Sequence, residues 1–183
     1  MRVISGSARG LKLSAPANDK VRPTTDRVKE SMFNIISFDI CDSVVLDLFS
    51  GSGSLGIECI SRGARKAYFC DKDKESIKLI KENIKKSRFE NKSEMFECDY
   101  KLALSKLQAK GEKIDIIFVD PPYYEGLFEE VLKNIEVANI IKDSTIVVVE
   151  HDAKTEIVDG TLLKKNKEKK YGLTKLTFYS VGE

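Results

Sequence analysis

The sequence has one histidine, His151, and four cysteines with no Cys-x-x-Cys pair among them. Zinc sites need more of these ligands at short spacing, and Ser-His-Asp or Cys-His catalysis needs an imidazole base. We therefore expect no metal site and no enzyme of those two classes. The thiols are expected to be reduced and buried, as free cysteine usually is, and His151 is a candidate for the rim of a site. The cysteines are Cys41, Cys59, Cys70 and Cys98.

A long apolar run is also missing. No stretch approaches the roughly 20 apolar residues that span a bilayer. The first residues, Met1–Gly6, contain no apolar core of signal-peptide length. We therefore expect a cytoplasmic protein without membrane contact. With 183 residues, of which 42% are hydrophobic and 33% charged, the chain has the size and composition of one folded domain.

The order of apolar patterns predicts a doubly wound α/β fold. Residues 1–43 are interpreted as a basic arm and a helix beginning near Thr25 or Asp26, within the same domain as residues 44–183. From residue 44, buried-strand patterns alternate with amphipathic helices, which predicts a mainly parallel sheet covered on both faces. The last two strands flank Tyr171-Gly172 and are expected to form an antiparallel hairpin. We expect seven strands, at 44–48, 67–70, 95–97, 114–119, 145–149, 162–170 and 173–180, and helices at 55–61, 74–87, 102–109 and 127–135.

A glycine-rich loop joins the first of these strands to its helix. Gly51 and Gly53 allow a tight turn and the close approach of a ligand, and Gly56 allows the helix to pack closely against the sheet. Asp71 lies 20 residues after Gly51, at the end of the second strand. A carboxylate there can accept hydrogen bonds from both ribose hydroxyls. This spacing fits a nicotinamide dinucleotide as well as S-adenosylmethionine.

Two further carboxylates favour S-adenosylmethionine. Asp47, four residues before the first glycine, suits a cationic methionine moiety better than a pyrophosphate. Asp99, at the end of the third strand, is placed to accept the adenine amino group, although an ordinary loop-capping aspartate explains it equally well. The predicted cofactor-binding residues are Asp47, Phe49, Gly51, Ser52, Gly53, Asp71, Lys72, Asp99 and Tyr100.

The motif Asp120-Pro121-Pro122-Tyr123 directly follows an apolar strand and is the most specific chemical signal. In a doubly wound sheet, ligands bind beyond the carboxyl ends of strands where the strand order reverses. The exocyclic amine of a base is a poor nucleophile, because its lone pair is drawn into the ring. The Asp120 carboxylate and the Pro121 carbonyl can accept its two N–H bonds, the two prolines stiffen the turn, and Tyr123 offers a face for stacking. These four residues are therefore the predicted catalytic set.

Several blocks of the chain resemble the RsmD family of bacterial 16S ribosomal RNA guanine-N2 methyltransferases. They are Arg2–Gly6 with Arg9-Gly10, the selective block Arg22–Glu30, the cofactor loop Asp47–Gly53, the motif at 119–123, and the tail from Lys170 to Tyr179. The resemblance implies a Rossmann-like class I methyltransferase fold, S-adenosylmethionine as donor, and one guanine of 16S rRNA as acceptor. It also implies that an assembled small subunit or an assembly intermediate is the substrate.

Two stretches are rich in basic residues, and each could meet phosphate or be a solvated surface. One is lysine-rich and covers residues 164–170. The other is the N-terminal arm, which we predict to contact RNA through Arg2, Arg9, Lys12, Arg22 and Arg27. The chain is expected to act as a monomer.

Three alternatives remain open. The motif at 120–123 would equally serve adenine N6 in DNA or RNA, or a protein glutamine amide, because each acceptor is a planar amine. A nicotinamide-dependent oxidoreductase is permitted by the glycine loop, but would leave that motif without a role. A non-catalytic RNA-binding protein with this fold would not need Asp120 or Tyr123.

Overall fold

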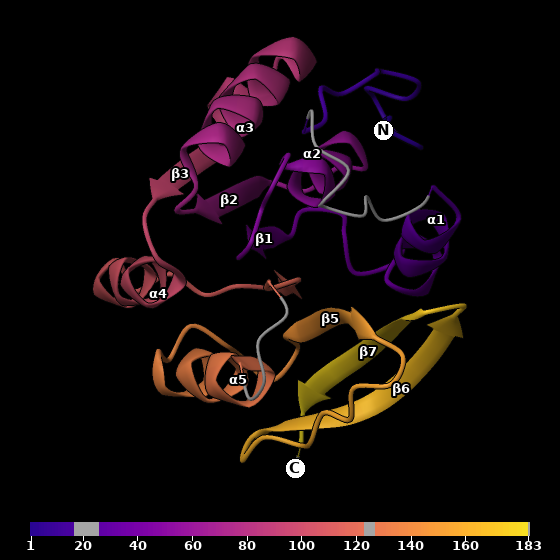
Figure 1. The fold of residues 1–183 in the computed structure, drawn as a ribbon. Helices are drawn as coiled ribbons and strands as arrows, with labels where there is room; N and C mark the ends of the chain where they lie inside the picture. Colours follow the sequence, from indigo (N-terminus) through magenta and orange to yellow (C-terminus); the bar gives the residue numbers. More distant parts are fainter. Residues whose placement is uncertain (17–25, 123–126, 183) are drawn as a thin grey trace.

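The computed structural model describes residues 1–16, 26–122 and 127–182, which fold around one seven-stranded sheet (Figure 1). The helices are α1 (Asp26–Ile35), α2 (Ser54–Ser61), α3 (Lys74–Ser87), α4 (Tyr100–Ala109) and α5 (Leu127–Val137), with a short 3-10 helix, η1 (Glu90–Lys92). The strands are β1 (Val44–Asp47), β2 (Lys66–Asp71), β3 (Ser93–Glu97), β4 (Ile116–Val119), β5 (Ile146–Asp152), β6 (Leu163–Tyr171) and β7 (Thr174–Val181).

The strand order is β3-β2-β1-β4-β5-β7-β6. The first five strands of this order are parallel, β7 runs antiparallel to β5, and β6 runs antiparallel to β7. The order along the chain reverses between β1 and β4, which are direct neighbours. The predicted doubly wound sheet with a terminal antiparallel hairpin is therefore confirmed. The glycine loop and the Asp-Pro-Pro motif follow the two strands on either side of this reversal.

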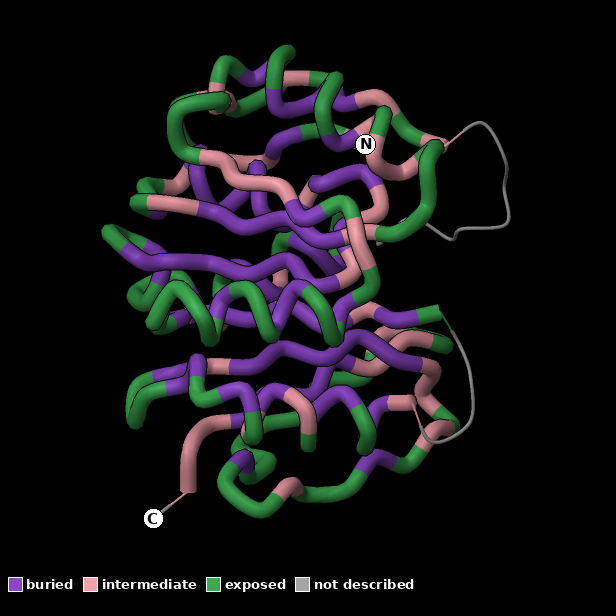
Figure 2. The backbone as a smooth tube through the Cα atoms, turned by 90° about the vertical axis from the view of Figure 1, so that its left-hand side faces the viewer, coloured by how far each residue is buried: buried purple, intermediate pink, exposed green. Residues whose placement is uncertain are grey.

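Side chains that alternate along the strands divide the core into two layers. Along β1, Val44 and Leu46 face α4 and α5, whereas Val45 faces α1, α2 and α3. Figure 2 shows the strands buried in the middle of the molecule and the exposed residues on the outer sides of the helices. Burial of both faces explains why the central strands are continuous apolar runs in the sequence.

Helix α3 shows how local signals set the ends of an element. The side chain of Asp73 accepts a hydrogen bond from Ser76 N (2.8 Å), which satisfies one of the free N–H groups of the first turn. Ile80 and Ile84 face the core, and the helix ends at Arg88, whose φ of 60° is left-handed. The predicted limits of this helix, 74 and 87, agree with the structure.

The N-terminal arm forms a small hairpin that the sequence patterns did not predict. Arg2 and Lys12 pair in an antiparallel bridge, supported by hydrogen bonds between Val3 N and Leu11 O (2.9 Å) and between Leu13 N and Met1 O (3.1 Å). Val3 and Leu13 are buried in the layer that contains α1, α2 and α3. The arm thus alternates buried apolar with exposed basic side chains, and it belongs to the same core as the sheet.

The structure corrects one expectation about the cysteines. Cys59 and Cys70 are buried and Cys98 is partly buried, but Cys41 is exposed in the turn before β1, so the prediction that all four thiols are buried is wrong. All four are free. No helix within the described residues is long and apolar enough to cross a membrane.

Candidate functional site at the carboxyl ends of β1 and β4

The glycine loop turns sharply after β1 and leaves open space above it. Gly51 and Gly53 have backbone φ values of 58° and 77°, which residues with a Cβ rarely adopt. A Cβ placed on Gly51 would meet no atom of the described residues within 4 Å. Ser50 holds the turn from within, because its hydroxyl donates to Asp47 O (2.7 Å) and accepts from Cys70 N (3.0 Å). The hydroxyl of Ser50 therefore fixes the turn, and among the loop glycines Gly51 is the one with open space beside its Cα.

Helix α2 begins at this loop and packs very closely against β2. A Cβ on Gly56 would lie 2.4 Å from a ring carbon of Phe69, so only glycine fits at this point. The N–H of Gly56 donates to Asp47 Oδ2 (3.1 Å). Asp47 is only 2% exposed, so its carboxyl group lies beneath the loop at the amino end of α2. The sequence placed Asp47 among the cofactor-binding residues, and this burial favours an electrostatic contribution over a direct contact.

Asp71 ends β2 with its carboxylate turned toward the glycine loop. Oδ2 accepts from Gly51 N (2.9 Å) and Oδ1 accepts from Asp73 N (2.9 Å). These backbone bonds orient the carboxylate, whose two oxygens together offer about four acceptor sites. Burial raises the pKa of Asp71, although the backbone N–H bonds act in the opposite direction. The neighbouring Lys72 is exposed.

The end of β3 brings Asp99 and an aromatic pair to the same edge of the sheet. The exposed side chain of Asp99 caps α4 by accepting from Lys101 N (2.9 Å), so a structural role accounts for this aspartate. Its second oxygen has no such bond to Lys101. Tyr100 is buried and packs against the half-buried ring of Phe49, with 5.4 Å between ring centroids. Phe49 and Tyr100 thus form an apolar wall beside the glycine loop.

The Asp-Pro-Pro segment follows β4, directly beside the loop. Leu48 N donates to Phe118 O (3.1 Å), which joins the ends of β1 and β4. Asp120 is partly exposed, Pro121 is buried and Pro122 is exposed. Tyr123, the last residue of the predicted catalytic set, lies outside the described residues.

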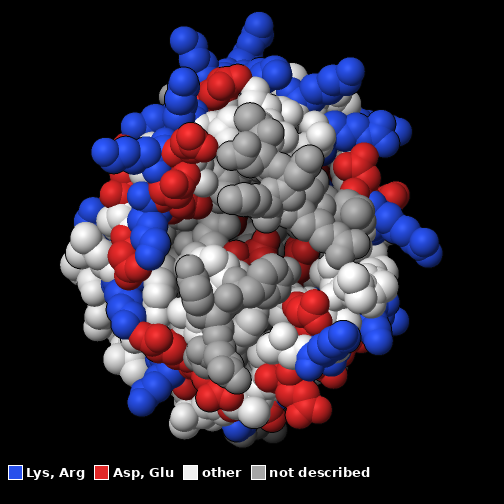
Figure 3. Space-filling model, viewed as in Figure 1, with Lys and Arg blue, Asp and Glu red and all other residues white. Residues whose placement is uncertain are grey.

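Carboxyl groups gather where these strands end. Burial raises the pKa of Asp120 well above its usual range, and the charges of Glu150 and Asp47 raise it further. Burial likewise raises the pKa of Asp47 to about 7, with Asp71 adding to the shift and Gly56 N–H opposing it. Figure 3 shows a hollow near the middle of this face with acidic side chains at its bottom. Such a group of carboxyls is electrostatically suited to a cation.

Within the part of the chain that the structure describes, no three or more His, Cys, Asp or Glu side chains are grouped so that they could hold a metal ion.

Comparison with known proteins assigns the family. The model of the family described as "Conserved hypothetical protein 95" matches residues 1–180. The chain belongs to this family. The match includes the N-terminal arm and the terminal hairpin, so it extends well beyond the glycine loop. The resemblance to the RsmD family is thereby confirmed.

Individual relatives agree with this assignment over most of the chain. YlbH of Bacillus subtilis is 39% identical over 181 residues, which cover 98% of this chain and 98% of that protein. Ribosomal RNA small subunit methyltransferase D of Escherichia coli is 36% identical over 154 residues and covers 84% of this chain and 76% of its own length. The solved structure of yhhF from Escherichia coli has a TM-score of 0.87 at 31% identity and covers 99% of this chain and 97% of its own.

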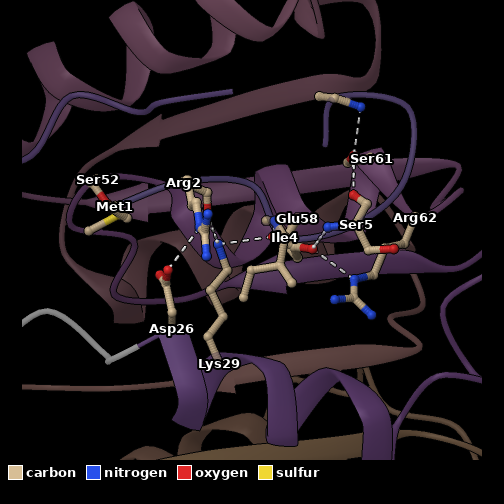
Figure 4. Close-up of polar contacts among 12 residues, drawn as sticks. Met1, Arg2, Ile4, Ser5, Asp26, Lys29, Ser52, Glu58, Ser61 and Arg62 are labelled. Carbon is tan, nitrogen blue, oxygen red and sulfur yellow. Dashed lines mark hydrogen bonds and ion pairs between the residues drawn. The ribbon is translucent and has the colours of Figure 1, made fainter. Parts of the chain in front are cut away.

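The basic arm lies along α2, held by a buried carboxylate that sequence reasoning missed. Glu58, which is fully buried, accepts from Ile4 N (2.8 Å) and Ser5 N (3.0 Å), and it pairs with Lys29 Nζ (3.0 Å) and Arg62 Nε (2.8 Å) (Figure 4). The only hint in the sequence is an acid inside the apolar run of α2. This group of contacts joins the arm, α1 and α2.

The predicted RNA-binding residues lie on the outside of this assembly. Arg9, Lys12 and Arg27 are exposed, and Arg2 pairs with Asp26 of α1 (3.0 Å). Arg22 lies outside the described residues. The lysine-rich stretch occupies β6, the exposed edge strand of the sheet.

His151 is not at the rim of the site. It is fully buried in β5, where Nδ1 is 2.9 Å from Asp152 O and Nε2 is 2.8 Å from Thr177 Oγ1. Burial lowers its pKa, which favours the neutral ring. The ring packs edge-on against Phe128 at 5.8 Å between centroids. We interpret His151 as a structural residue of the sheet.

Proposed function

We propose that this chain is an S-adenosylmethionine-dependent methyltransferase that methylates the exocyclic N2 amine of a guanine in 16S ribosomal RNA. The observation that carries the proposal is the juxtaposition, at the reversal of strand order, of an open glycine loop after β1 and an Asp-Pro-Pro segment after β4. The names of relatives at 32–36% identity, small subunit methyltransferase D, support the choice of RNA.

The carboxyl groups in the hollow support the choice of donor. A sulfonium and an ammonium group carry positive charge, which the cluster of Asp47, Asp120 and Glu150 stabilises, whereas the phosphates of a nicotinamide dinucleotide would be repelled. Asp71 is oriented toward the ribose hydroxyls by the backbone of the loop. The rings of Phe49 and Tyr100 provide an apolar side for the adenine, and Asp99, Lys72 and the loop at 51–53 complete the proposed set.

The residues after β4 position the acceptor amine. The Asp120 carboxylate and the Pro121 carbonyl accept its two N–H bonds and direct the nitrogen lone pair toward the methyl carbon of the donor. A nitrogen–carbon bond forms as the carbon–sulfur bond breaks, and the nitrogen then releases a proton to Asp120 or to water. Asp120 stabilises the positive charge that develops on nitrogen, and the conformational restriction of Pro121 and Pro122 keeps the acceptors in place. Tyr123 is the proposed stacking surface for the base.

The arm is the proposed RNA contact outside the reaction centre. Arg9, Lys12 and Arg27 offer exposed cations for phosphate groups, with Arg2 and Arg22 completing the set. An assembled small subunit or an assembly intermediate is the proposed substrate, and a monomer is the proposed active form. The burial of Val3 and Leu13 in the shared core supports one domain, in which residues 1–43 are an extension of residues 44–183.

The test is methyl transfer from labelled S-adenosylmethionine to small ribosomal subunits taken from cells that lack this gene, followed by nucleoside analysis. Label in N2-methylguanosine supports the proposal as a whole. Label in another nucleoside, or label only in DNA or in protein glutamine, keeps the chemistry but moves the acceptor to one of the alternatives above. Asp120→Ala is the matched variant, and it should bind the donor yet transfer no methyl group. Near-normal turnover of this variant would show that Asp120 is not catalytic.

A further inference from the structure

We infer that Asn83 is a positioning residue that couples the basic arm to the glycine loop, so that binding of the cofactor and binding of RNA strengthen each other. The inference rests on the function proposed above. It begins from one fully buried amide on α3, whose three hydrogen bonds all reach other segments of the chain.

Two of these bonds hold the arm and one holds the loop. Asn83 Oδ1 accepts from Ser14 N (2.8 Å), and Nδ2 donates both to Ser14 O (2.9 Å) and to Ser52 O (2.9 Å). Ser52 is the central residue of the loop, between the two glycines with positive φ. The amide thus uses both of its N–H groups, and any shift of Ser52 O disturbs the bonds to Ser14.

A second contact joins the same two segments. The hydroxyl of Ser52 donates to the sulfur of Met1 (3.1 Å), and Met1 O accepts from Leu13 N within the arm hairpin (Figure 4). Both ends of the arm hairpin, Met1 and Ser14, are therefore fixed at the glycine loop. At its tip the hairpin is fixed to the far end of α2, where Ala8 N donates to Ser61 Oγ (2.9 Å) and Ser61 Oγ donates to Ser5 O (2.6 Å).

The sign of the coupling follows from the cost of ordering these segments. A cofactor that contacts the loop fixes Ser52 O, and with it the Asn83 amide that Ser14 needs. The arm then loses less conformational entropy when its basic residues bind RNA. Because linkage is reciprocal, RNA on the arm must raise the affinity for the cofactor by the same factor.

The experiment measures this factor with S-adenosylhomocysteine, which permits binding without turnover. The affinity of the full-length protein for unmethylated small subunits is measured with and without saturating S-adenosylhomocysteine. We expect the wild type to bind subunits about fivefold more tightly, or better, when the ligand is present, at the low end of typical allosteric coupling. In Asn83→Ala the ratio should fall close to one.

Ser61→Ala is the matched control, because it also removes two hydrogen bonds to the arm but none to the loop. It should keep the wild-type ratio even where its affinity for subunits falls. A residue that only stabilises the fold would change both affinities and leave their ratio intact. A wild-type ratio of one, or an unchanged ratio in Asn83→Ala, overturns the inference. A wild type that binds no S-adenosylhomocysteine overturns the proposed function itself.

Hydrogen exchange on the wild type keeps the test decisive if Asn83→Ala does not fold. Saturating S-adenosylhomocysteine should slow exchange at the N–H groups of Ile4, Ser5 and Ser14, which bond to Glu58 and Asn83. Unchanged exchange at all three, with the ligand demonstrably bound, overturns the inference.

Discussion

Binding of S-adenosylmethionine should release a proton from Asp47, and we expect its affinity to rise with pH up to about neutrality. In the free protein, burial raises the pKa of this carboxyl to about 7, with the charge of Asp71 contributing in the same direction. A cation in the hollow favours the ionised carboxylate and therefore lowers the pKa in the complex. Below pH 7 the free protein holds a proton that the complex does not, so acid weakens binding.

The magnitude follows from the two protonation states. With a pKa of about 7 in the free protein, Asp47 holds about 0.9 proton at pH 6 and about 0.1 at pH 8, and a complex in which this carboxyl is fully ionised releases these amounts. The same values make binding about tenfold weaker at pH 6 than at pH 8. The raised pKa of Asp120 adds to the effect in the same direction.

Calorimetry in two buffers of different ionisation enthalpy measures the released protons directly. The informative quantity is the difference between the wild type and Asp47→Asn, since proton exchange by the ligand itself cancels. The variant keeps an oxygen for the N–H of Gly56 and should release about 0.9 proton fewer than the wild type at pH 6. Asp39→Asn removes an exposed carboxyl beyond the end of α1 and serves as the control. Equal proton release by the wild type and Asp47→Asn would refute the reasoning.

Three further predictions concern the N-terminal arm, helix α2 and the buried ion pair between Glu58 and Lys29. Removing two cations with Arg9→Ala and Lys12→Ala should weaken RNA binding and flatten the slope of log affinity against log salt by about 1.4 to 1.8, with cofactor affinity unchanged; an unchanged slope would exclude these residues as phosphate contacts. Gly56→Ala places a methyl group 2.4 Å from the ring of Phe69 on β2 and should lower the free energy of unfolding by about 1–3 kcal/mol, as measured by urea titration. Glu58→Gln leaves Lys29 buried without its counter-charge and should cost about 3–5 kcal/mol at pH 7. Burial raises the pKa of Glu58, but the charge of Lys29 and the N–H of Ile4 outweigh burial, so the net pKa is lowered. The stability that the ionised Glu58 contributes is therefore fully present above the ordinary carboxyl pKa. The difference in unfolding free energy between Glu58→Gln and the wild type should narrow as the pH falls below about 4.5.

The sequence predicted those elements whose signals are local. Apolar runs located the strands, and the periodic isoleucines of an amphipathic pattern located α3 at both ends. The glycine loop and the Asp-Pro-Pro motif were placed beside each other because the fold class dictates which strand ends meet. Predicted and observed limits differ by a few residues elsewhere, as for β4, which begins at Ile116 rather than at residue 114.

The parts that could not be predicted depend on contacts between distant segments. Glu58 bonds to residues more than 50 positions earlier, and Asn83 bonds to Ser14 across 69 positions. Neither side chain has a local pattern that distinguishes it from an ordinary helix residue. The hairpin of the arm was likewise missed, because Arg2 and Lys12 pair through a single bridge and the arm gains its stability from packing on α2.

These long-range contacts give the buried charges of the molecule two different roles. Glu58 is compensated within the chain, by two cations and two backbone N–H groups, so its charge stabilises the folded state without any ligand. Asp47 and Asp120 are not compensated in this way, and burial raises the pKa of both. Keeping them ionised costs free energy in the free protein, and a bound cation recovers that cost. The first arrangement therefore belongs to the architecture that holds the arm, and the second to a site that is complete only when its positively charged ligand is present.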